Sequence, residues 1–168
     1  AQVIPVEPHT EICQLEVAMR YTESYTENIW CFTNHIHNPE GGTHLTGFRT
    51  ALTRTINHYA REKQLLKEKE DNFVAEDVRE GLTAVISIKV AEPQFEGQTK
   101  GKLGNSEVRP AVEAAFAEAF AEYLEENPNE ARAVIGKCLL AARARKAARA
   151  ARDTVIRKGA LEGMTLPG

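Results

Sequence analysis

The chain has 168 residues, of which 42% are hydrophobic and 27% charged, a composition that predicts one globular domain with a buried core. No apolar run approaches the roughly 18 residues of a membrane span and no secretory leader is evident, so we expect a cytoplasmic protein with no membrane association. The three cysteines, Cys13, Cys31 and Cys138, include no Cys-x-x-Cys pair, which indicates reduced thiols and excludes a disulfide framework.

The net charge of −3 conceals an uneven distribution. Residues 131–158 hold nine Lys or Arg against one acid, Asp153, whereas the rest of the chain is acidic. Such asymmetry is typical of a nucleic-acid or partner surface at one end of a protein. The sequence also begins without Met, and we expect an excised fragment.

The first part of the chain has the pattern of strands. Residues 3–6 predict a short edge strand, since Pro5 is tolerated only at an edge. Apolar and polar residues alternate over 12–21, which indicates a half-buried strand. Residues 29–36 are rich in β-forming side chains, and the polar turn at 22–27 predicts that these two strands form a hairpin.

A helix, a short turn and another strand follow. Thr43 is the predicted N-cap of an amphipathic helix that ends near residue 60. Residues 61–72 are dense in charge and predict a solvated helix end and loop. One helical turn is expected over 76–80, where Asp77 is interpreted as a helix-end charge. Residues 82–90 alternate cleanly and predict a second strand.

The last part of the chain predicts two helices. Asn105 or Ser106 is expected to cap the first. Asn127 followed by Pro128 marks the start of the second, which we expect to run to about residue 158. Together with the strands, these helices predict an α+β fold of two layers, a mainly antiparallel sheet with helices on one face.

The final helix changes character at its middle. The apolar stripe of its first half continues on the same face as Arg145, Arg149 and Arg152. Three stacked arginines cannot remain in an apolar core without partners, so we expect the helix to leave the domain there. Residues 1–142 are predicted as the α+β domain and 143–168 as a projecting helix and tail. The projecting half either connects to another domain or faces nucleic-acid phosphates.

Residues 97–104, Gly-Gln-Thr-Lys-Gly-Lys-Leu-Gly, form the strongest candidate site. Glycine permits backbone shapes that other residues resist, and lysine offers a mobile charge suited to phosphate. The spacing departs from the Gly-x₄-Gly-Lys-Ser/Thr pattern of a P-loop, so the loop cannot hold a nucleotide by itself. It is either a solvated turn or a contact to phosphate.

A zinc site is an alternative because Cys31, His35 and His37 share strand parity and His44 lies nearby. Their spacing matches no recognised zinc pattern, and neighbouring strand residues rarely converge tetrahedrally, so we predict no metal site. No order of Ser, His, Asp or Cys residues indicates a catalytic group, and none is predicted.

Three stretches resemble the B subunit of DNA gyrase, a type IIA topoisomerase. They are Glu-Gly-Gly-Thr-His-Leu-Thr-Gly-Phe-Arg at 40–49, Asp-Val-Arg-Glu-Gly-Leu at 77–82, and the segment 93–109 with Gln-Thr-Lys at 98–100. The ending at 157–168 is similar as well. The corresponding subunit of topoisomerase IV shares these motifs, but Gly-Asn-Ser-Glu-Val-Arg favours gyrase. The resemblance covers most of the chain and is to the transducer, the second half of the N-terminal ATPase region.

This resemblance implies the fold of the second domain of small-subunit ribosomal protein five, with a left-handed β-α-β crossover against the usual rule. It implies ATP and Mg²⁺ as cofactors of a full-length isomerase, neither held by this fragment alone, which we expect to be inactive in isolation. The implied partners are the preceding ATPase domain and following Toprim domain of the same chain, the gyrase A subunit, a second B subunit and duplex DNA.

In the family, the lysine of Gln-Thr-Lys contacts the terminal phosphate of ATP in the neighbouring domain, and the glutamine assists. The resemblance gives these roles to Lys100 and Gln98. A contact to the terminal phosphate distinguishes ATP from ADP, so nucleotide state can shift a conformational equilibrium that reaches the DNA gates. The family also has an arginine-lined cavity for a duplex, and helical phase and charge make Arg145, Arg149 and Arg152 candidates for its lining.

Two other functions stay open at this point. One is a free-standing module that binds duplex nucleic acid through the helix over 131–158, and the other is a small phosphate-handling enzyme centred on 97–104. The acidic remainder of the chain and the incomplete phosphate loop argue against both.

Overall fold

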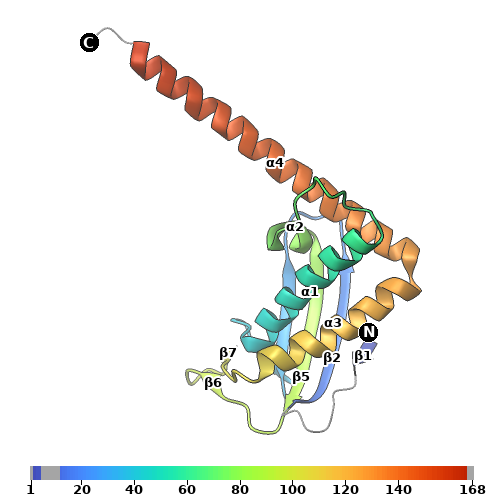
Figure 1. Ribbon diagram of the computed structural model, residues 1–168. Coiled ribbons are helices and arrows are strands. Elements are labelled where there is room, and N and C mark those ends of the chain that lie inside the picture. The colour runs from blue at the N-terminus through green and yellow to red at the C-terminus, as the bar shows by residue number, and fades with distance from the viewer. Residues whose placement is uncertain (1, 5–11, 166–168) are drawn as a thin grey trace.

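A computed structural model describes residues 2–4 and 12–165 as a five-stranded sheet with helices packed on one of its faces and a separate two-stranded ribbon (Figure 1). The elements in chain order are β1 (Gln2–Ile4), β2 (Ile12–Tyr21), β3 (Asn28–Thr33), β4 (Ile36–His37), α1 (Thr43–Glu62), α2 (Ala75–Arg79), β5 (Leu82–Val90), β6 (Phe95–Glu96), β7 (Lys102–Leu103), α3 (Val108–Glu126) and α4 (Pro128–Thr165). This is the predicted α+β class with a long C-terminal helix. No helix in the described part of the chain is both long and apolar enough to cross a membrane.

The five-stranded sheet has the order β1-β2-β5-β3-β4, with β5 at its centre. β5 is antiparallel to β2 and parallel to β3, and its side chains alternate between the buried face and the open face. β1 and β4 each pair antiparallel with one neighbour, so the sheet is mainly antiparallel, as predicted. β1 confirms an edge strand in the predicted segment, although residues 5 and 6 lie outside the described part.

The predicted hairpin between residues 12–21 and 29–36 is wrong, because β5 lies between β2 and β3. The segment 22–27 instead passes over the start of β5, where the Thr22 amide donates to the Gly81 carbonyl at 2.8 Å. Alternation specifies which face of a strand is buried but not which strand lies beside it. β5 offers β2 a pairing that continues to Val90, which a hairpin with the shorter β3 would not provide.

The predicted strand over 29–36 is also divided in two. Asn34 and His35 have positive φ angles of 50° and 67°, and the chain turns back so that Phe32 pairs with His37. Two positive φ values are typical of the tightest hairpin turns, which asparagine tolerates well. The Asn34 side chain also bonds the amide and carbonyl of Val90, at 2.9 and 3.0 Å, in place of a further strand residue.

The connection from β3 through α1 to β5 joins parallel neighbours and is the predicted crossover. In Figure 1, α1 lies in front of the sheet, β3 lies to the left of β5, and both strands run downward. A connection with this arrangement is left-handed, which is rare in parallel β-α-β units.

Helices α1 and α3 form the second layer and bury the core against the sheet. Phe48 of α1 is fully buried, and its ring centroid lies 4.8 Å from that of Phe116 of α3. Phe116 in turn stacks on Phe120 at 5.2 Å. Each fully buried side chain of this size stabilises the fold by about 1.5–3 kcal/mol, so the two predicted apolar helix faces account for much of the core.

Two predicted helix caps are wrong. Gly42, and not Thr43, is the N-cap of α1, and Glu107 is the N-cap of α3 in place of Asn105 or Ser106. Asn105 supports the neighbouring loop instead, as described below. α4 begins at Pro128 as predicted.

Helix α4 packs on the body with its first half only. Ala131, Ile135, Cys138 and Ala142 are buried, whereas every described side chain from 146 to 163 is exposed. Figure 1 shows this second half extending away from the rest of the described chain. The helix reaches Thr165, seven residues beyond the predicted end at residue 158.

Candidate functional site

The glycine-rich segment forms the tip of a small two-stranded ribbon. β6 and β7 pair antiparallel, with Phe95 opposite Leu103 and Glu96 opposite Lys102. Residues 97–100 connect the two strands and are exposed. Figure 1 shows this ribbon at the end of the body that lies away from the projecting half of α4. The two candidate sites predicted from the sequence, the loop and the arginine face, are therefore far apart.

The base of this loop is held by the segment that precedes α1. The Leu103 amide donates to the Gly41 carbonyl at 3.0 Å, and the Glu40 amide donates to the Gly101 carbonyl at 2.9 Å. Leu103 is fully buried and also forms a parallel bridge with Gly42. The Glu-Gly-Gly motif and the Gln-Thr-Lys motif are therefore neighbours in space, although about 60 residues separate them in the sequence.

Gly42 permits this close approach. Its φ angle of 135° lies in a region that residues with a Cβ rarely adopt. A Cβ at this position would lie 2.3 Å from the Leu103 carbonyl oxygen and 2.5 Å from the Leu103 nitrogen. Glycine is thus required here by both the backbone conformation and the contact with β7.

Two buried asparagines fix the ends of the loop. Asn38 donates to the Lys100 carbonyl at 2.8 Å and accepts from the Thr33 hydroxyl at 2.7 Å. Asn105 accepts from the Gln94 amide at 2.6 Å and donates to the Glu92 carbonyl at 3.0 Å. Each is only 1% exposed, so its bonds are shielded from water. Sequence reasoning missed the role of Asn38 and took Asn105 for a helix cap.

The two lysines of the loop differ. Lys102 lies 3.3 Å from Glu96, its partner across the ribbon. Lys100 has a positive φ of 56°, its carbonyl is fixed by Asn38, and its side chain is exposed. Within the described ranges, neither the Lys100 ammonium nor the Gln98 amide has a hydrogen bond or ion pair to another residue. The loop therefore presents one unpaired cation on a backbone that is fixed behind it.

The three arginines of the α4 face have different environments. Arg145 donates through Nε and Nη2 to the two carboxylate oxygens of Asp77, at 2.9 and 3.1 Å, and this bond raises the pKa of the Arg145 guanidinium. Arg149 and Arg152 are exposed one and two turns further along the helix. On this face of α4, the exposed arginines thus begin after Arg145.

A second charged cluster, which sequence reasoning missed, lies at the base of β3. Glu27 accepts a hydrogen bond from Arg49 of α1 and lies 3.5 Å from Arg79 of α2. The cluster ties the crossing segment 22–27 to both helices. Arg49 ends the first of the family motifs, which is the signal that could have directed attention to it.

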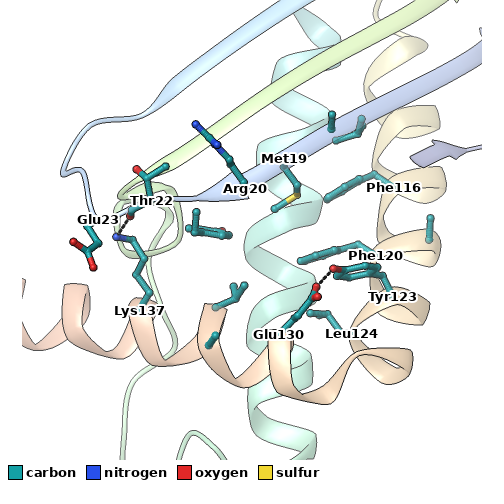
Figure 2. A pocket seen from close by; sticks show the side chains of 16 residues that line it. Met19, Arg20, Thr22, Glu23, Phe116, Phe120, Tyr123, Leu124, Glu130 and Lys137 are labelled. Carbon is teal, nitrogen blue, oxygen red and sulfur yellow. Dashed lines mark hydrogen bonds between the residues drawn. The ribbon is translucent and has the colours of Figure 1, made fainter. Parts of the chain in front are cut away.

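A cleft with a volume of about 930 Å³ lies between β2, α3 and α4 (Figure 2). Met19, Phe116 and Phe120 give it an apolar floor. Two of its polar contacts are internal, because Lys137 donates to the Thr22 carbonyl and Tyr123 donates to Glu130. The cleft contains none of the residues of the loop or of the arginine face.

The residues considered for zinc are not arranged as ligands. Burial raises the pKa of the Cys31 thiol to about 12 and lowers the pKa of His44 to about 4. The turn at His35 breaks the strand parity that suggested a site, and the His37 ring packs against Phe32. In the part of the chain that the structure covers, no three His, Cys, Asp or Glu side chains are grouped to hold a metal ion.

The family model for DNA gyrase B matches residues 1–154. The chain belongs to the DNA gyrase B family. The DNA gyrase B protein of Bacillus mycoides is 59% identical over 155 residues, which are 92% of this chain and 38% of that protein. The chain therefore spans well under half of this gyrase B relative.

Solved structures of the family have the same fold. The 43K ATPase domain of Thermus thermophilus gyrase B, solved with an aminocoumarin, superposes with a TM-score of 0.81 at 44% identity, covering 91% of this chain and 40% of that one. The topoisomerase IV ATP-binding domain of Francisella tularensis, solved with a small-molecule inhibitor, gives a TM-score of 0.73 at 32% identity, covering 86% and 39%. The gyrase B fold thus extends to topoisomerase IV, as the shared motifs predicted.

Proposed function

We propose that the chain is the transducer domain of the ATP-hydrolysing B subunit of a bacterial DNA gyrase, with residues 1–142 as its α+β domain and 143–168 as a projecting helix and tail. In this proposal the whole protein is a cytoplasmic isomerase that couples ATP hydrolysis, with Mg²⁺, to DNA strand passage and supercoiling. Its partners are the preceding ATPase domain, the following Toprim domain, the gyrase A subunit, a second B subunit and duplex DNA. Membership of the gyrase B family supports this assignment.

The observation that carries the proposal is the exposed, unpaired Lys100 side chain on a loop whose base is fixed. ATP bound in the neighbouring domain would supply the terminal phosphate that the Lys100 ammonium contacts. Gln98, exposed on the same tip, would assist with its amide. An exposed lysine can reach out of its own domain, while the bond from Asn38 keeps its backbone from moving with it. We assign the Mg²⁺ ligands to the preceding domain, because no three His, Cys, Asp or Glu side chains of the described residues are grouped to hold a metal ion.

The contact between Gly42 and Leu103 links the loop to the rest of the domain. A pull on Lys100 would be transmitted through Leu103 to the start of α1 and, in the other direction along the chain, to β5. ATP has a terminal phosphate that ADP lacks. A contact between Lys100 and this phosphate would therefore shift the equilibrium position of the α+β domain. On this basis the loop senses nucleotide state, and the groups that activate water lie outside this chain.

We further propose that Arg149 and Arg152 line a cavity for duplex DNA, because their half of α4 is exposed and strongly basic. Arg145, a candidate on the same face, is paired with Asp77. The same basic half of α4 favours a second function, a free-standing module that binds duplex DNA. That module would bind DNA as the isolated chain, with a steep salt dependence and no dependence on nucleotide.

A pair of lysine variants of the complete gyrase B protein tests the proposal. Because a charge-assisted hydrogen bond contributes about 1.5–3 kcal/mol, Lys100→Ala should lower ATP turnover roughly 10- to 100-fold. Lys102→Ala removes the same charge from the same loop and should stay within about fivefold, since its exposed ion pair contributes about 0–1 kcal/mol. Unchanged turnover in Lys100→Ala, or ATP hydrolysis by the isolated chain, would refute the assignment.

A further inference from the structure

Helix α4 leaves the body at a single buried carboxylate. Asp77 of α2 is 2% exposed and receives two hydrogen bonds from the Arg145 guanidinium, at 2.9 and 3.1 Å. Residues before Arg145 pack into the core through Ala142, and those after it are exposed. A two-bond arginine–carboxylate pair fixes direction as well as distance, because the planar fork fits the carboxylate in one orientation.

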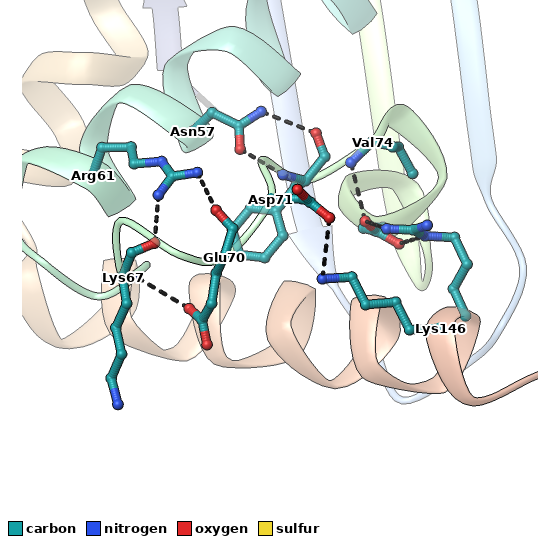
Figure 3. Close-up of polar contacts among 10 residues, drawn as sticks. Asn57, Arg61, Lys67, Glu70, Asp71, Val74 and Lys146 are labelled. Atoms are coloured by element: carbon teal, nitrogen blue, oxygen red, sulfur yellow. Dashed lines mark hydrogen bonds and ion pairs between the residues drawn. The ribbon is translucent and has the colours of Figure 1, made fainter. Parts of the chain in front are cut away.

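The carboxylate itself is held from behind. Asp77 Oδ2 accepts from the Val74 amide at 3.0 Å. The residue before Val74 is tied to α1, since the Asn57 side chain bonds both the amide and the carbonyl of Phe73, at 2.8 and 3.0 Å (Figure 3). Arg61 of α1 bonds the carbonyls of Lys67 and Glu70 in the same loop. Helix α1 therefore holds the segment that leads to Asp77 in place.

The other polar contact at this point is weaker. Lys146 lies 3.7 Å from Asp71, and both side chains are largely exposed (Figure 3). Exposed pairs of this kind contribute little and do not fix geometry. The Asp77–Arg145 pair is therefore the contact that can set the direction of the projecting helix.

A small change in the direction of α4 at this point moves the far end of the helix by a large distance. The helix continues from residue 146 to Thr165, a length of about 30 Å at 1.5 Å per residue. A rotation of about 10° at the joint would move its end by about 5 Å. Asp77 also lies just before β5, and the other end of β5 leads into the loop that carries Lys100.

We infer that the Asp77–Arg145 ion pair is a positioning joint that sets the direction of α4 on the body and couples the loop at Lys100 to the projecting helix. The coupling rests on the proposed function, whereas the control of direction does not. The pair acts through α4, so Asp77 and Arg145 are positioning residues that contact neither nucleotide nor reacting atoms.

The direction of α4 can be measured in the complete gyrase B protein. Spin labels at Ala151→Cys on α4 and Lys89→Cys on β5, both exposed positions, would report the distance between the helix and the body after other reactive cysteines are removed. We expect Asp77→Asn to broaden this distance distribution at least twofold. Lys146→Ala, which breaks the neighbouring exposed pair, should leave it narrow. An unchanged distribution in Asp77→Asn would overturn the inference.

Two variants of the gyrase complex test the coupling and separate it from direct DNA contact. Asp77→Asn keeps the arginine, whereas Arg145→Gln removes it. A positioning joint predicts that both lower the supercoiling obtained per ATP hydrolysed by about tenfold. If only Arg145→Gln lowers it, the arginine acts on DNA directly and the joint is refuted. Should Arg145→Gln fail to fold, with a buried carboxylate left unpaired, Asp77→Asn alone decides, since an unchanged coupling ratio refutes the joint.

The outcomes also separate this inference from the proposed function. If Lys100→Ala leaves ATP turnover unchanged but Asp77→Asn broadens the label distances, the nucleotide-sensing role fails and the control of direction stands. If Lys100→Ala abolishes turnover but Asp77→Asn changes neither distance nor coupling, the joint fails and the sensing role stands.

Discussion

Replacing Gly42 by Ala tests the contact that holds the Gln98–Lys100 loop to α1. The Gly42 backbone, with φ 135° and ψ −157°, lies in a region that costs a residue with a side chain about 1–3 kcal/mol. The added Cβ would lie 2.3 Å from the Leu103 carbonyl oxygen, and moving that backbone adds about 1–3 kcal/mol. We expect Gly42→Ala to lower the free energy of unfolding by roughly 2–6 kcal/mol, a large part of the 5–15 kcal/mol of a typical domain.

Gly97 is the matched control for this change. It also has a positive φ, of 83°, but a Cβ there meets nothing within 4 Å. Gly97→Ala should therefore cost only the backbone term, about 1–2 kcal/mol. Urea unfolding of the wild type and both variants, followed by circular dichroism, gives the comparison. Equal losses in the two variants would show that the approach of Gly42 to Leu103 does not hold the loop.

Two further predictions concern pH and helix stability. His44 is fully buried, and its two ring nitrogens have no hydrogen-bond partner among the described residues. Its pKa is lowered to about 4, below the 6.5 of the unfolded chain, so stability is lost as pH falls below 6.5. We expect the free energy of unfolding to fall by about 2 kcal/mol between pH 7 and 5 in the wild type and in the exposed control His58→Gln. It should not fall in this way in His44→Leu, and equal pH dependence in all three proteins would contradict the prediction. Gly136 lies inside α4 with open space around it, so Gly136→Ala should raise the free energy of unfolding by about 0.5–1 kcal/mol, and a decrease in urea unfolding would refute the reasoning.

The sequence predicted the faces of the strands better than their neighbours. Alternation over residues 82–90 identified β5 and its buried side, because burial of one face requires that period. It could not show that β5 separates β2 from β3, since two strands joined by a short polar segment favour a hairpin on local grounds alone. The pairing that prevails depends on residues that lie far apart in the chain, where the periodicity of one segment carries no information.

In the candidate site, too, local features could be predicted from the sequence, whereas contacts between distant residues could not. Glycine and lysine content identified the loop, and the motif identified Lys100 within it, whereas the support from Asn38 crosses 62 residues of sequence. For α4, the change from apolar residues to arginines indicated where core packing ends. The partner of Arg145 is 68 residues away and was interpreted as a helix-end charge. Asp77 does accept a hydrogen bond from a backbone amide at the start of α2. The interpretation as a helix-end charge was therefore correct but left out the ion pair with Arg145.

The central position of β5 affects how the chain can fold while it is being synthesised. Its neighbours β2 and β3 are made first, but the strand that joins them follows only at Leu82–Val90. Until then each of the two earlier strands has an unpaired edge toward the gap, and such edges can pair with other chains. A nascent chain that stops before residue 82 should therefore aggregate. Release after α3 should yield a sheet in which β5 joins β2 to β3, with α1 and α3 packed on it.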